Sequence, residues 1–287
     1  MRSIEVATIL THRRPEDTGP ALATLIDLAR DAGVTLRFDP DETAKHALPD
    51  DPAVVANAPI DPRVDICFAL GGDGTILTAL RHFAGTGVPV FGVNFGEIGF
   101  LSTVDREAAQ DGFRRAFNGD FDVLSLPGIT VSGVRPELIA INDVSIIRQP
   151  GRRVAQLAYS VGGDEVGRVR CDGLVVATPA GSTGYNMANG GPIMAWGVEG
   201  YVVSFIAPHS LTARPVVVAP DDVLVVHNRS EEETVDVAVD GRPAGELDAG
   251  RPLEMRFARD QGRLAQIAGV TFYQRLQEKF GLLATGA

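Results

Sequence analysis

The sequence lacks several features that would decide its class at once. Its 287 residues include 26 lysine and arginine residues against 37 aspartate and glutamate residues, and the net charge of −11 argues against a nucleic-acid-binding surface. No apolar run approaches the roughly 18 residues of a membrane-spanning helix, and Glu5 interrupts the apolar start that a signal peptide would need. We therefore expect a cytoplasmic protein with no nucleic-acid or membrane partner.

Cysteine and lysine are also scarce. The two cysteines, Cys67 and Cys171, have neither the Cys-x-x-Cys nor the Cys/His spacing of metal sites, so we expect buried, reduced thiols. The only lysines are Lys45 and Lys279, and neither follows a glycine. A Walker A loop requires Gly-Lys-Ser/Thr, and protein kinases require a strand lysine in a Val-Ala-Ile-Lys-type motif. Both nucleotide-binding classes are therefore excluded.

The residues that are present predict a globular protein of two domains. Hydrophobic residues make up 45% and charged residues 22%, which allows the chain to bury a core. The length also favours two domains, at about 150 residues per domain. Alternating strand-like and helix-like periods in residues 1–120 predict an open parallel sheet covered by helices. Short β-branched segments between turn pairs in residues 121–270 predict a mostly β domain.

Local signals set the expected boundaries of individual elements. Thr18 as N-cap and Gly33 as the end predict the first helix, and residues 39–62 have the composition of a polar loop. Single strands are predicted over residues 168–177 and over residues 253–257. Residues 271–280 return to helical spacing, and we expect a C-terminal helix within residues 271–287 to complete the first domain.

The run Gly71-Gly72-Asp73-Gly74-Thr75 is the first segment that indicates chemistry, because it joins a predicted strand to a predicted helix. Ligands of open α/β sheets bind at this edge, and glycine amides at a helix N-terminus suit phosphate. Phosphate would repel Asp73, so this residue needs a task such as accepting a hydroxyl proton or helping to hold a divalent cation. The same run also fits a tight turn in which Asp73 caps the helix.

A second, longer segment is rich in glycine and small hydroxyl residues. It begins at Arg170 and continues through DGLVVATPAGSTGYNMANGGP at residues 172–192. This composition does not suit a regular core element, but it can wrap a polyhydroxylated ligand while Tyr185 covers an aromatic face. The alternative is a flexible glycine loop.

Arginine is concentrated just before this segment. We interpret residues 148–170 either as a hairpin that faces phosphate or as a solvated edge strand protected by charge. Its charged residues are Arg148, Arg152, Arg153, Arg168 and Arg170, against Asp164 and Glu165.

Five segments together resemble the NAD kinase family in order and spacing, over most of the chain. They are GGDGT, GVNFGEIGFLS at residues 92–102, INDVSI at 141–146, DGLVVATPAGSTGYNMANGGP at 172–192 and PHSLTARPVVV at 208–218. GGDGT alone also occurs in 6-phosphofructokinases and lipid kinases. The long glycine-rich segment does not belong to those relatives, and lipid kinases tend to have Asn-Glu where Ile76-Leu77 stands here.

The resemblance implies an α/β N-terminal domain that holds the phosphate donor and the catalytic loop, and a mostly β C-terminal domain that binds the dinucleotide. It also implies phosphorylation of the adenosine ribose 2′-hydroxyl of NAD to give NADP. The phosphoryl donor would be ATP or polyphosphate, with Mg²⁺ or another divalent cation whose ligands the resemblance does not assign. It implies that Asp73 is the general base. The implied NAD-binding residues are Asp73, Gly74, Asn142, Asp143, Arg170, Asp172, Thr183, Gly184, Tyr185, Asn186, Met187 and Ala188. Those implied to bind the donor phosphates are Gly71, Gly72, Gly74 and Thr75.

Several alternatives stay open at this point. The family usually has Asn-Glu where this chain has Asn142-Asp143, whose acidic side chain is one methylene shorter. The same loops would serve a non-catalytic regulator that senses dinucleotides, or a related kinase of a sugar phosphate or a lipid. The sequence has no basic amphipathic segment suited to a membrane surface, which disfavours the lipid. The resemblance also implies a homodimer or homotetramer.

Overall fold

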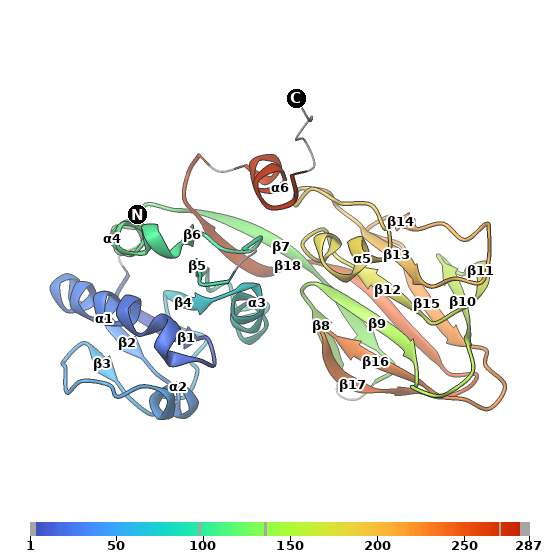
Figure 1. Cartoon of the computed structure of the whole chain (residues 1–287), viewed down its shortest axis with the longest axis horizontal. Helices are drawn as coiled ribbons and strands as arrows, with labels where there is room; N and C mark the ends of the chain where they lie inside the picture. The colour runs from blue at the N-terminus through green and yellow to red at the C-terminus, as the bar shows by residue number, and fades with distance from the viewer. Residues whose placement is uncertain (1–3, 97–98, 135–136, 270, 282–287) are drawn as a thin grey trace. The chain divides into compact units, whose positions relative to one another are not determined.

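The computed structural model describes residues 4–96, 99–134, 137–269 and 271–281, and Figure 1 shows its elements. The chain forms two compact units, residues 1–125 with 262–287, and residues 126–261. The unit boundaries fall inside two long strands, β7 (Asp122–Ser132) and β18 (Pro252–Gln266), so each strand belongs partly to each unit. In the described part of the chain, no helix is long and apolar enough to cross a membrane.

The first unit is an α/β fold on a parallel sheet. Its elements are β1 (Val6–Thr11), α1 (Pro15–Ala32), β2 (Thr35–Arg37), α2 (Pro40–Lys45), β3 (Val54–Val55), β4 (Ile66–Gly71), α3 (Asp73–His82), β5 (Val90–Asn94), β6 (Val104–Asp105), the 3-10 helix η1 (Arg106–Ala108), α4 (Ala109–Phe117) and α6 (Phe272–Phe280). The strand order is β18-β5-β4-β1-β2-β3, and these neighbours pair in parallel. Every residue of β4 is buried, as is typical of a sheet covered on both faces.

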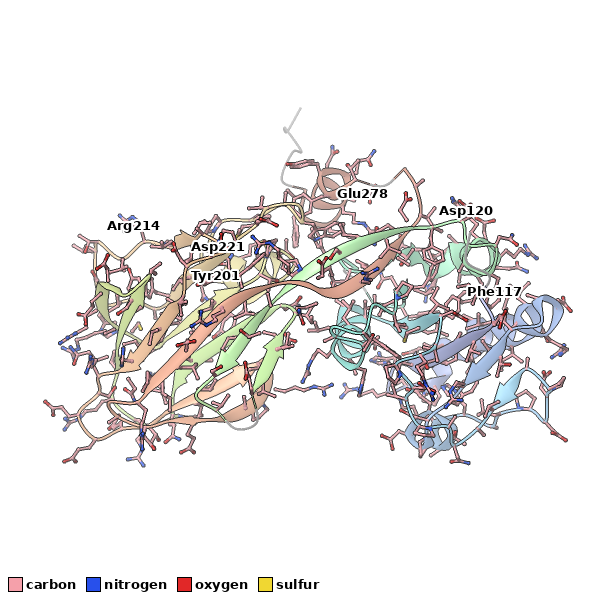
Figure 2. The ribbon with its side chains drawn as sticks, turned by 180° about the vertical axis from the view of Figure 1, so that it is seen from behind. Phe117, Asp120, Tyr201, Arg214, Asp221 and Glu278 are labelled. Atoms are coloured by element: carbon pink, nitrogen blue, oxygen red, sulfur yellow. The ribbon has the colours of Figure 1, made fainter. Side chains whose placement is uncertain are left out.

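Aromatic packing anchors α4 on the middle of this sheet. The Phe68 ring of β4 lies 5.6 Å from the Phe91 ring of β5 and 5.7 Å from the Phe113 ring of α4. Phe117, labelled in Figure 2, extends the cluster at 5.5 Å from Phe68. Such ring pairs add to the burial of apolar area, so they fix the strands whose carboxyl ends carry the glycine-rich turn.

Two details of the first unit differ from the sequence-based expectation. Helix α1 begins at Pro15, so the prediction of Thr18 as N-cap is wrong: Thr18 lies buried inside the helix. Proline suits the first helical turn because its missing N–H would have no partner there. Residues 39–62 are also not wholly a loop, because Asp39 caps α2 by accepting a hydrogen bond of 2.7 Å from the Glu42 amide.

The second unit is mostly β and contains two antiparallel sheets. Besides parts of β7 and β18, its elements are β8 (Leu138–Ala140), β9 (Asp143–Arg148), β10 (Ala155–Val161), β11 (Asp164–Cys171), β12 (Gly173–Ala177), the 3-10 helix η2 (Gly181–Thr183), α5 (Tyr185–Ala188), β13 (Tyr201–Ile206), β14 (Val216–Val218), β15 (Leu224–Asn228), β16 (Val235–Val239) and β17 (Arg242–Leu247). One sheet has the strand order β11-β10-β15-β18, and the other has the order β14-β13-β12-β9-β16-β17.

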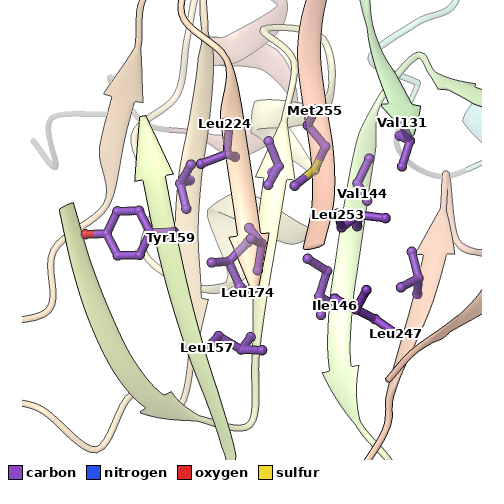
Figure 3. Close-up of a cluster of buried hydrophobic side chains, with 14 of the residues drawn as sticks. Val131, Val144, Ile146, Leu157, Tyr159, Leu174, Leu224, Leu247, Leu253 and Met255 are labelled. Carbon is purple, nitrogen blue, oxygen red and sulfur yellow. The ribbon is translucent and has the colours of Figure 1, made fainter. Parts of the chain in front are cut away.

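Side chains from both sheets form one apolar core in the second unit. Figure 3 shows Leu157 and Leu224 from the first sheet beside Ile146 and Leu174 from the second, and all four are fully buried. Cys171 belongs to the same core, and the structure confirms that both cysteines are free and buried. This core fixes β9, which begins at Asp143 directly after Asn142, and β12, which begins directly after Asp172.

The expectation of one strand over residues 168–177 is wrong, because the chain breaks at Asp172 into β11 and β12. The two strands belong to different sheets, β11 beside β10 and β12 between β9 and β13. Gly173 permits the crossing, since a Cβ there would lie 2.5 Å from the Ile146 carbonyl oxygen. The strand expected over residues 253–257 is likewise too short, because β18 runs on into the first unit.

Candidate active site

The glycine-rich turn after β4 places Asp73 at the first position of α3. Gly72 is the N-cap, in an extended conformation. A side chain at Gly71 would collide with that of Thr75. A Cβ on Gly96 would lie 3.4 Å from the Gly72 Cα, so the turn packs backbone to backbone on the segment that follows β5.

Two backbone amides hold the two oxygens of the Asp73 carboxylate. The Phe100 N–H donates to Oδ2 and the Leu101 N–H donates to Oδ1, each at 2.9 Å. Burial raises the pKa of Asp73, while these two hydrogen bonds and the charges of Arg275 and Lys279 act to lower it. The carboxylate is thus fixed in direction and holds a proton more strongly than a solvated aspartate, as suits a general base.

Helix α6 supports the segment that holds Asp73. The Phe100 ring lies 5.6 Å from the Phe272 ring and 5.8 Å from the Phe280 ring, so the aromatic face of α6 encloses it. Arg275 is only 5% exposed and donates to the Phe100 carbonyl oxygen at 3.4 Å and to Gln266 Oε1 at 3.0 Å. Phe100 therefore links the buried Arg275 to Asp73: its carbonyl oxygen accepts from Arg275, and its N–H donates to the Asp73 carboxylate.

A cavity of about 910 Å³ adjoins the glycine-rich turn within the first unit. Asn94 shapes it, because its Oδ1 accepts from the Gly96 N–H at 2.9 Å. Cationic side chains of Arg14, Arg106 and Lys279 line the cavity, together with several carboxylates. Its volume suits a small molecule, and Gly96 connects its wall to the turn.

In the second unit, the predicted pair Asn142-Asp143 lies where β9 begins. Thr178, which follows β12, holds it: the Thr178 hydroxyl donates to the Ile141 carbonyl oxygen at 2.6 Å, and the Thr178 N–H donates to the Asn142 carbonyl oxygen at 2.9 Å. Gly181 packs so closely that a side chain would collide with the Asn142 carbonyl. Burial, and secondarily a neighbouring carboxylate, raises the pKa of Asp143 to about 7.

The glycine-rich segment after β12 folds into η2 and α5. The Asn186 side chain is fully buried, and its Nδ2 donates to the carbonyl oxygens of Ser182 at 2.9 Å and Pro192 at 3.0 Å. Asn186 therefore ties this loop together from inside. The Tyr185 ring is 38% exposed, and burial together with the carboxylates of Asp143 and Asp172 raises its pKa. Thr183 and Met187 are half-buried, and Gly184 and Ala188 are exposed.

Asp172 and Arg170 lie at the other end of β12 from the Asn142-Asp143 pair. Ala177 pairs with Asp143 and Gly173 with Ile147, so the length of β12, about 15 Å for its five residues, separates Asp172 from Asp143. The structure thus brings Asn142, Asp143 and the η2–α5 segment together and places Arg170 and Asp172 in a second group at the far end of β12, from which the Asp172 charge still acts on the Tyr185 hydroxyl.

The second group is set among the arginines noted in the sequence. Arg148 binds the Asp172 carboxylate through Nε. Arg170 is exposed and lines a cavity of about 570 Å³ together with Arg152 and Arg153. Strand β11 is the edge of its sheet and mostly exposed, which agrees with the interpretation of this hairpin as a charged edge.

Both units match known proteins. Residues 10–121 match the family model of the ATP-NAD kinase N-terminal domain, and residues 141–266 match that of the ATP-NAD kinase C-terminal domain. An NAD kinase of Gemmatimonas aurantiaca is 32% identical over 279 residues, which cover 95% of this chain and 94% of that protein. The chain belongs to the NAD kinase family.

Further comparisons agree with membership of the NAD kinase family. An NAD kinase of Lachnoclostridium phytofermentans is 30% identical, over 95% of this chain and 98% of that protein. The crystal structure of yeast NADH kinase complexed with NADH has a TM-score of 0.86 at 22% identity and covers 100% of this chain and 90% of its own. The crystal structure of an NAD kinase from Archaeoglobus fulgidus in complex with ATP has a TM-score of 0.73 at 23% identity, and the match covers 96% of this chain and 97% of that chain. The predicted family and two-part fold are confirmed.

Some residues of the site escaped the sequence analysis. The amides of Phe100 and Leu101 lie within a recognised motif, but a backbone donor leaves no trace in side-chain chemistry. Arg275 follows Phe272 by three positions on the apolar face of α6, and this helical spacing could have revealed it. Asp240 lies in an Asp-Gly pair, which in the sequence indicates a hairpin turn and not a part of a ligand site.

Proposed function

We propose that the protein transfers the terminal phosphoryl group of ATP or polyphosphate to the adenosine ribose 2′-hydroxyl of NAD, giving NADP. Membership of the NAD kinase family supports this proposal, and structures with the same fold are complexes with NADH and with ATP. The observation that carries it is the Asp73 carboxylate, which two backbone amides aim from the carboxyl edge of a parallel sheet.

In this reaction Asp73 is the general base. The 2′-hydroxyl oxygen attacks the terminal phosphorus of the donor, and the bond from that phosphorus to the bridging oxygen breaks. When ATP is the donor, the leaving group is ADP. The hydroxyl proton passes to an Asp73 oxygen. Burial raises the proton affinity of Asp73, which favours the transfer, and the nearby cations stabilise the ionised carboxylate that must be present beforehand.

The donor phosphates would bind at the N-terminus of α3. The turn formed by Gly71, Gly72, Gly74 and Thr75 lies at the positive end of the helix, which favours anions, while the Thr75 N–H itself donates to the Gly72 carbonyl oxygen at 2.9 Å. In the adjoining cavity, Arg14, Arg106 and Lys279 each pair with a carboxylate of the lining, so an anionic donor would exchange these ion pairs for charge-assisted hydrogen bonds to its own phosphates.

The predicted divalent cation fits best as part of the donor. Among the residues that the structure describes, no group of three or more His, Cys, Asp or Glu side chains could hold a metal ion. We therefore propose that Mg²⁺ arrives bound to the donor phosphates, where it would neutralise charge during the transfer.

On the acceptor side we propose that Asn142 and Asp143 bind the adenosine part of NAD, and that Asp73 and Gly74 meet its ribose. Tyr185 presents an exposed ring on which a flat base can stack. Buried Asn186 holds the loop in shape. Thr183, Gly184, Met187 and Ala188 would complete the pocket wall. Asp172 and Arg170, just before the start of β12, would meet a more distant part of the dinucleotide.

The decisive experiment measures NADP formation by Asp73→Asn with donor and acceptor varied separately. We expect the variant to bind NAD but to turn over about 10²–10⁴-fold more slowly, the usual contribution of a general base. Asp27→Asn, on the exposed surface of α1, is the matched control. Unchanged turnover of Asp73→Asn would remove the residue from this role.

The wild-type protein separates the rival functions in the same assay. Tight dinucleotide binding without any NADP would favour a non-catalytic regulator, and phosphorylation of a sugar phosphate or a lipid in place of NAD would favour the third hypothesis. A homodimer or homotetramer and a cytoplasmic location belong to the proposal as well, and sedimentation velocity tests the first of these.

A further inference from the structure

The hairpin turn between β16 and β17 reaches the start of β9. Asp240 and Gly241 form this turn with φ angles of 49° and 71°, which an Asp-Gly pair tolerates well. Asp240 Oδ2 accepts from the Ile141 N–H at 3.1 Å, and Oδ1 accepts from the N–H groups of Asn142 at 2.7 Å and Asp143 at 3.1 Å. In return, the Asp240 N–H donates to the Asp143 carbonyl oxygen at 2.8 Å.

These four hydrogen bonds fix the backbone from which the Asn142 and Asp143 side chains project. Three consecutive amides on one carboxylate leave residues 141–143 little freedom to rotate. Thr178 holds the carbonyl side of the same residues, so the pair is held from two elements that are distant in sequence. A site whose side chains are set by a rigid backbone loses less entropy when a ligand binds.

Asp240 also brings negative charge next to Asp143. A carboxylate that accepts three amide hydrogen bonds is stabilised as an anion, and a second carboxyl group beside it resists ionisation. Burial is the larger cause and Asp240 the second cause of the raised pKa of Asp143, which is about 7. Asp143 also interacts with the Tyr185 hydroxyl of α5.

We propose that Asp240 is a positioning residue of the dinucleotide site, which fixes the backbone of Asn142-Asp143 and places a carboxylate beside the Asp143 side chain. The inference rests on one part of the proposed function, the binding of a dinucleotide at this site, and it does not require phosphoryl transfer. It implies that proton binding by Asp143 and dinucleotide binding are linked near neutral pH, because Asp143 changes its charge there.

The test compares Asp240→Asn with Asp260→Asn. Asparagine tolerates a positive φ and keeps one oxygen for the Asn142 and Asp143 amides, but it removes the charge. Asp260 has a similar φ of 56° and is exposed in β18, so the same substitution there is a matched control away from the pair. Carbon-13 NMR of aspartate carboxyl groups in the free protein follows the titration, with Asp143→Asn to assign the Asp143 signal.

We expect the Asp143 signal of the wild-type protein to titrate near pH 7 and to move down by about one to two pH units in Asp240→Asn, as expected for a charge at roughly 6 Å. We also expect the Kd for NAD to rise roughly tenfold in Asp240→Asn, with its pH dependence displaced in the same direction. Asp260→Asn should leave both quantities unchanged.

A purely structural role for Asp240 would weaken NAD binding without moving the titration. The proposal is therefore overturned if the Asp143 midpoint is the same in folded Asp240→Asn and wild type, or if Asp260→Asn moves it equally. Should Asp240→Asn not fold, the wild-type protein decides, because titration of Asp143 in the ordinary aspartate range overturns the proposal. The NMR titration needs no dinucleotide, so its outcome is independent of whether wild-type protein makes NADP.

Discussion

Replacement of Arg275 by methionine should make Asp73 harder to ionise. Arg275 is buried in α6, and its guanidinium binds the carbonyl of Phe100, whose N–H binds Asp73. Burial lowers the pKa of Arg275, and carboxylates including Asp73 and Asp105 act to raise it. The cation stays buried because these acidic groups surround it, so its removal leaves Asp73 in a more negative environment.

The expected shift follows from Coulomb's law. The path from Arg275 through Phe100 to the Asp73 carboxylate corresponds to a separation of roughly 8 Å, which at an effective dielectric constant of about 20 gives about 2 kcal/mol. Since 1.4 kcal/mol is about one pKa unit, the pKa of Asp73 should rise by about 1 to 1.5 units. A base must be ionised to act, so the acid limb of the kcat/KM profile should move to higher pH by that amount.

The assay is NADP formation from pH 5 to 9 for wild type, Arg275→Met, Arg275→Lys and Lys279→Met. Arg275→Lys keeps the charge and should restore most of the wild-type midpoint. Lys279→Met should shift it less, because the side chain of Lys279 is 18% exposed and water screens its charge. If Arg275→Met lowers kcat/KM equally at every pH and leaves the midpoint in place, the electrostatic reasoning is refuted and Arg275 only holds α6 in place.

Two further predictions concern the second unit. Gly181→Ala should lower the free energy of unfolding by about 1–3 kcal/mol and weaken NAD binding, because the new methyl group would displace the Asn142 carbonyl; thermal unfolding measures this against Gly197→Ala, where nothing lies within 4 Å of the new Cβ. Asp143 has a folded-state pKa of about 7 against its usual 3.8, so the folded protein binds its proton more tightly and loses stability as pH rises between these values. Asp143→Asn removes this pH-dependent loss of stability. Between pH 4 and 8 the free energy of unfolding of Asp143→Asn should therefore rise, relative to that of the wild type, by on the order of a few kcal/mol. If the free energies of unfolding of the two proteins change with pH in parallel, the assignment of the raised pKa to Asp143 is contradicted.

The sequence predicted the arrangement of the two-part fold better than the limits of its elements. Alternation of strand and helix periods in the first part correctly indicated a parallel sheet, because covered sheets need continuous apolar strands such as β4. Boundaries failed where local rules compete: both Pro15 and Thr18 are good helix starts, and the structure begins α1 at Pro15. The break at Asp172 depends on Gly173 passing close to β9, which is a tertiary contact with no local signal.

In the candidate site, too, the sequence predicted some residues and not others. Asp73, Asn142 and Asp143 stand in motifs whose side chains suggest their chemistry, and these assignments remain predictions until the variants are measured. Their supports lie far away in the chain: Phe100 is 27 positions from Asp73, Asp240 is 98 from Asn142, and Arg275 is 175 from Phe100. Backbone donors and contacts over such separations depend on the folded topology, so one sequence without its structure does not reveal them.

Asp73 and Asp240 show how the same device has opposite consequences in the two units. Each carboxylate is held by consecutive backbone amides, at residues 100–101 for Asp73 and at residues 141–143 for Asp240. Beside Asp73 the structure adds a buried cation, which favours the ionised form that a base needs. Beside Asp143 the neighbouring charge is the Asp240 carboxylate, which disfavours ionisation of Asp143. Burial raises the pKa of both residues; at Asp73 the amide hydrogen bonds and the nearby cations oppose this effect, whereas at Asp143 the Asp240 carboxylate adds to it.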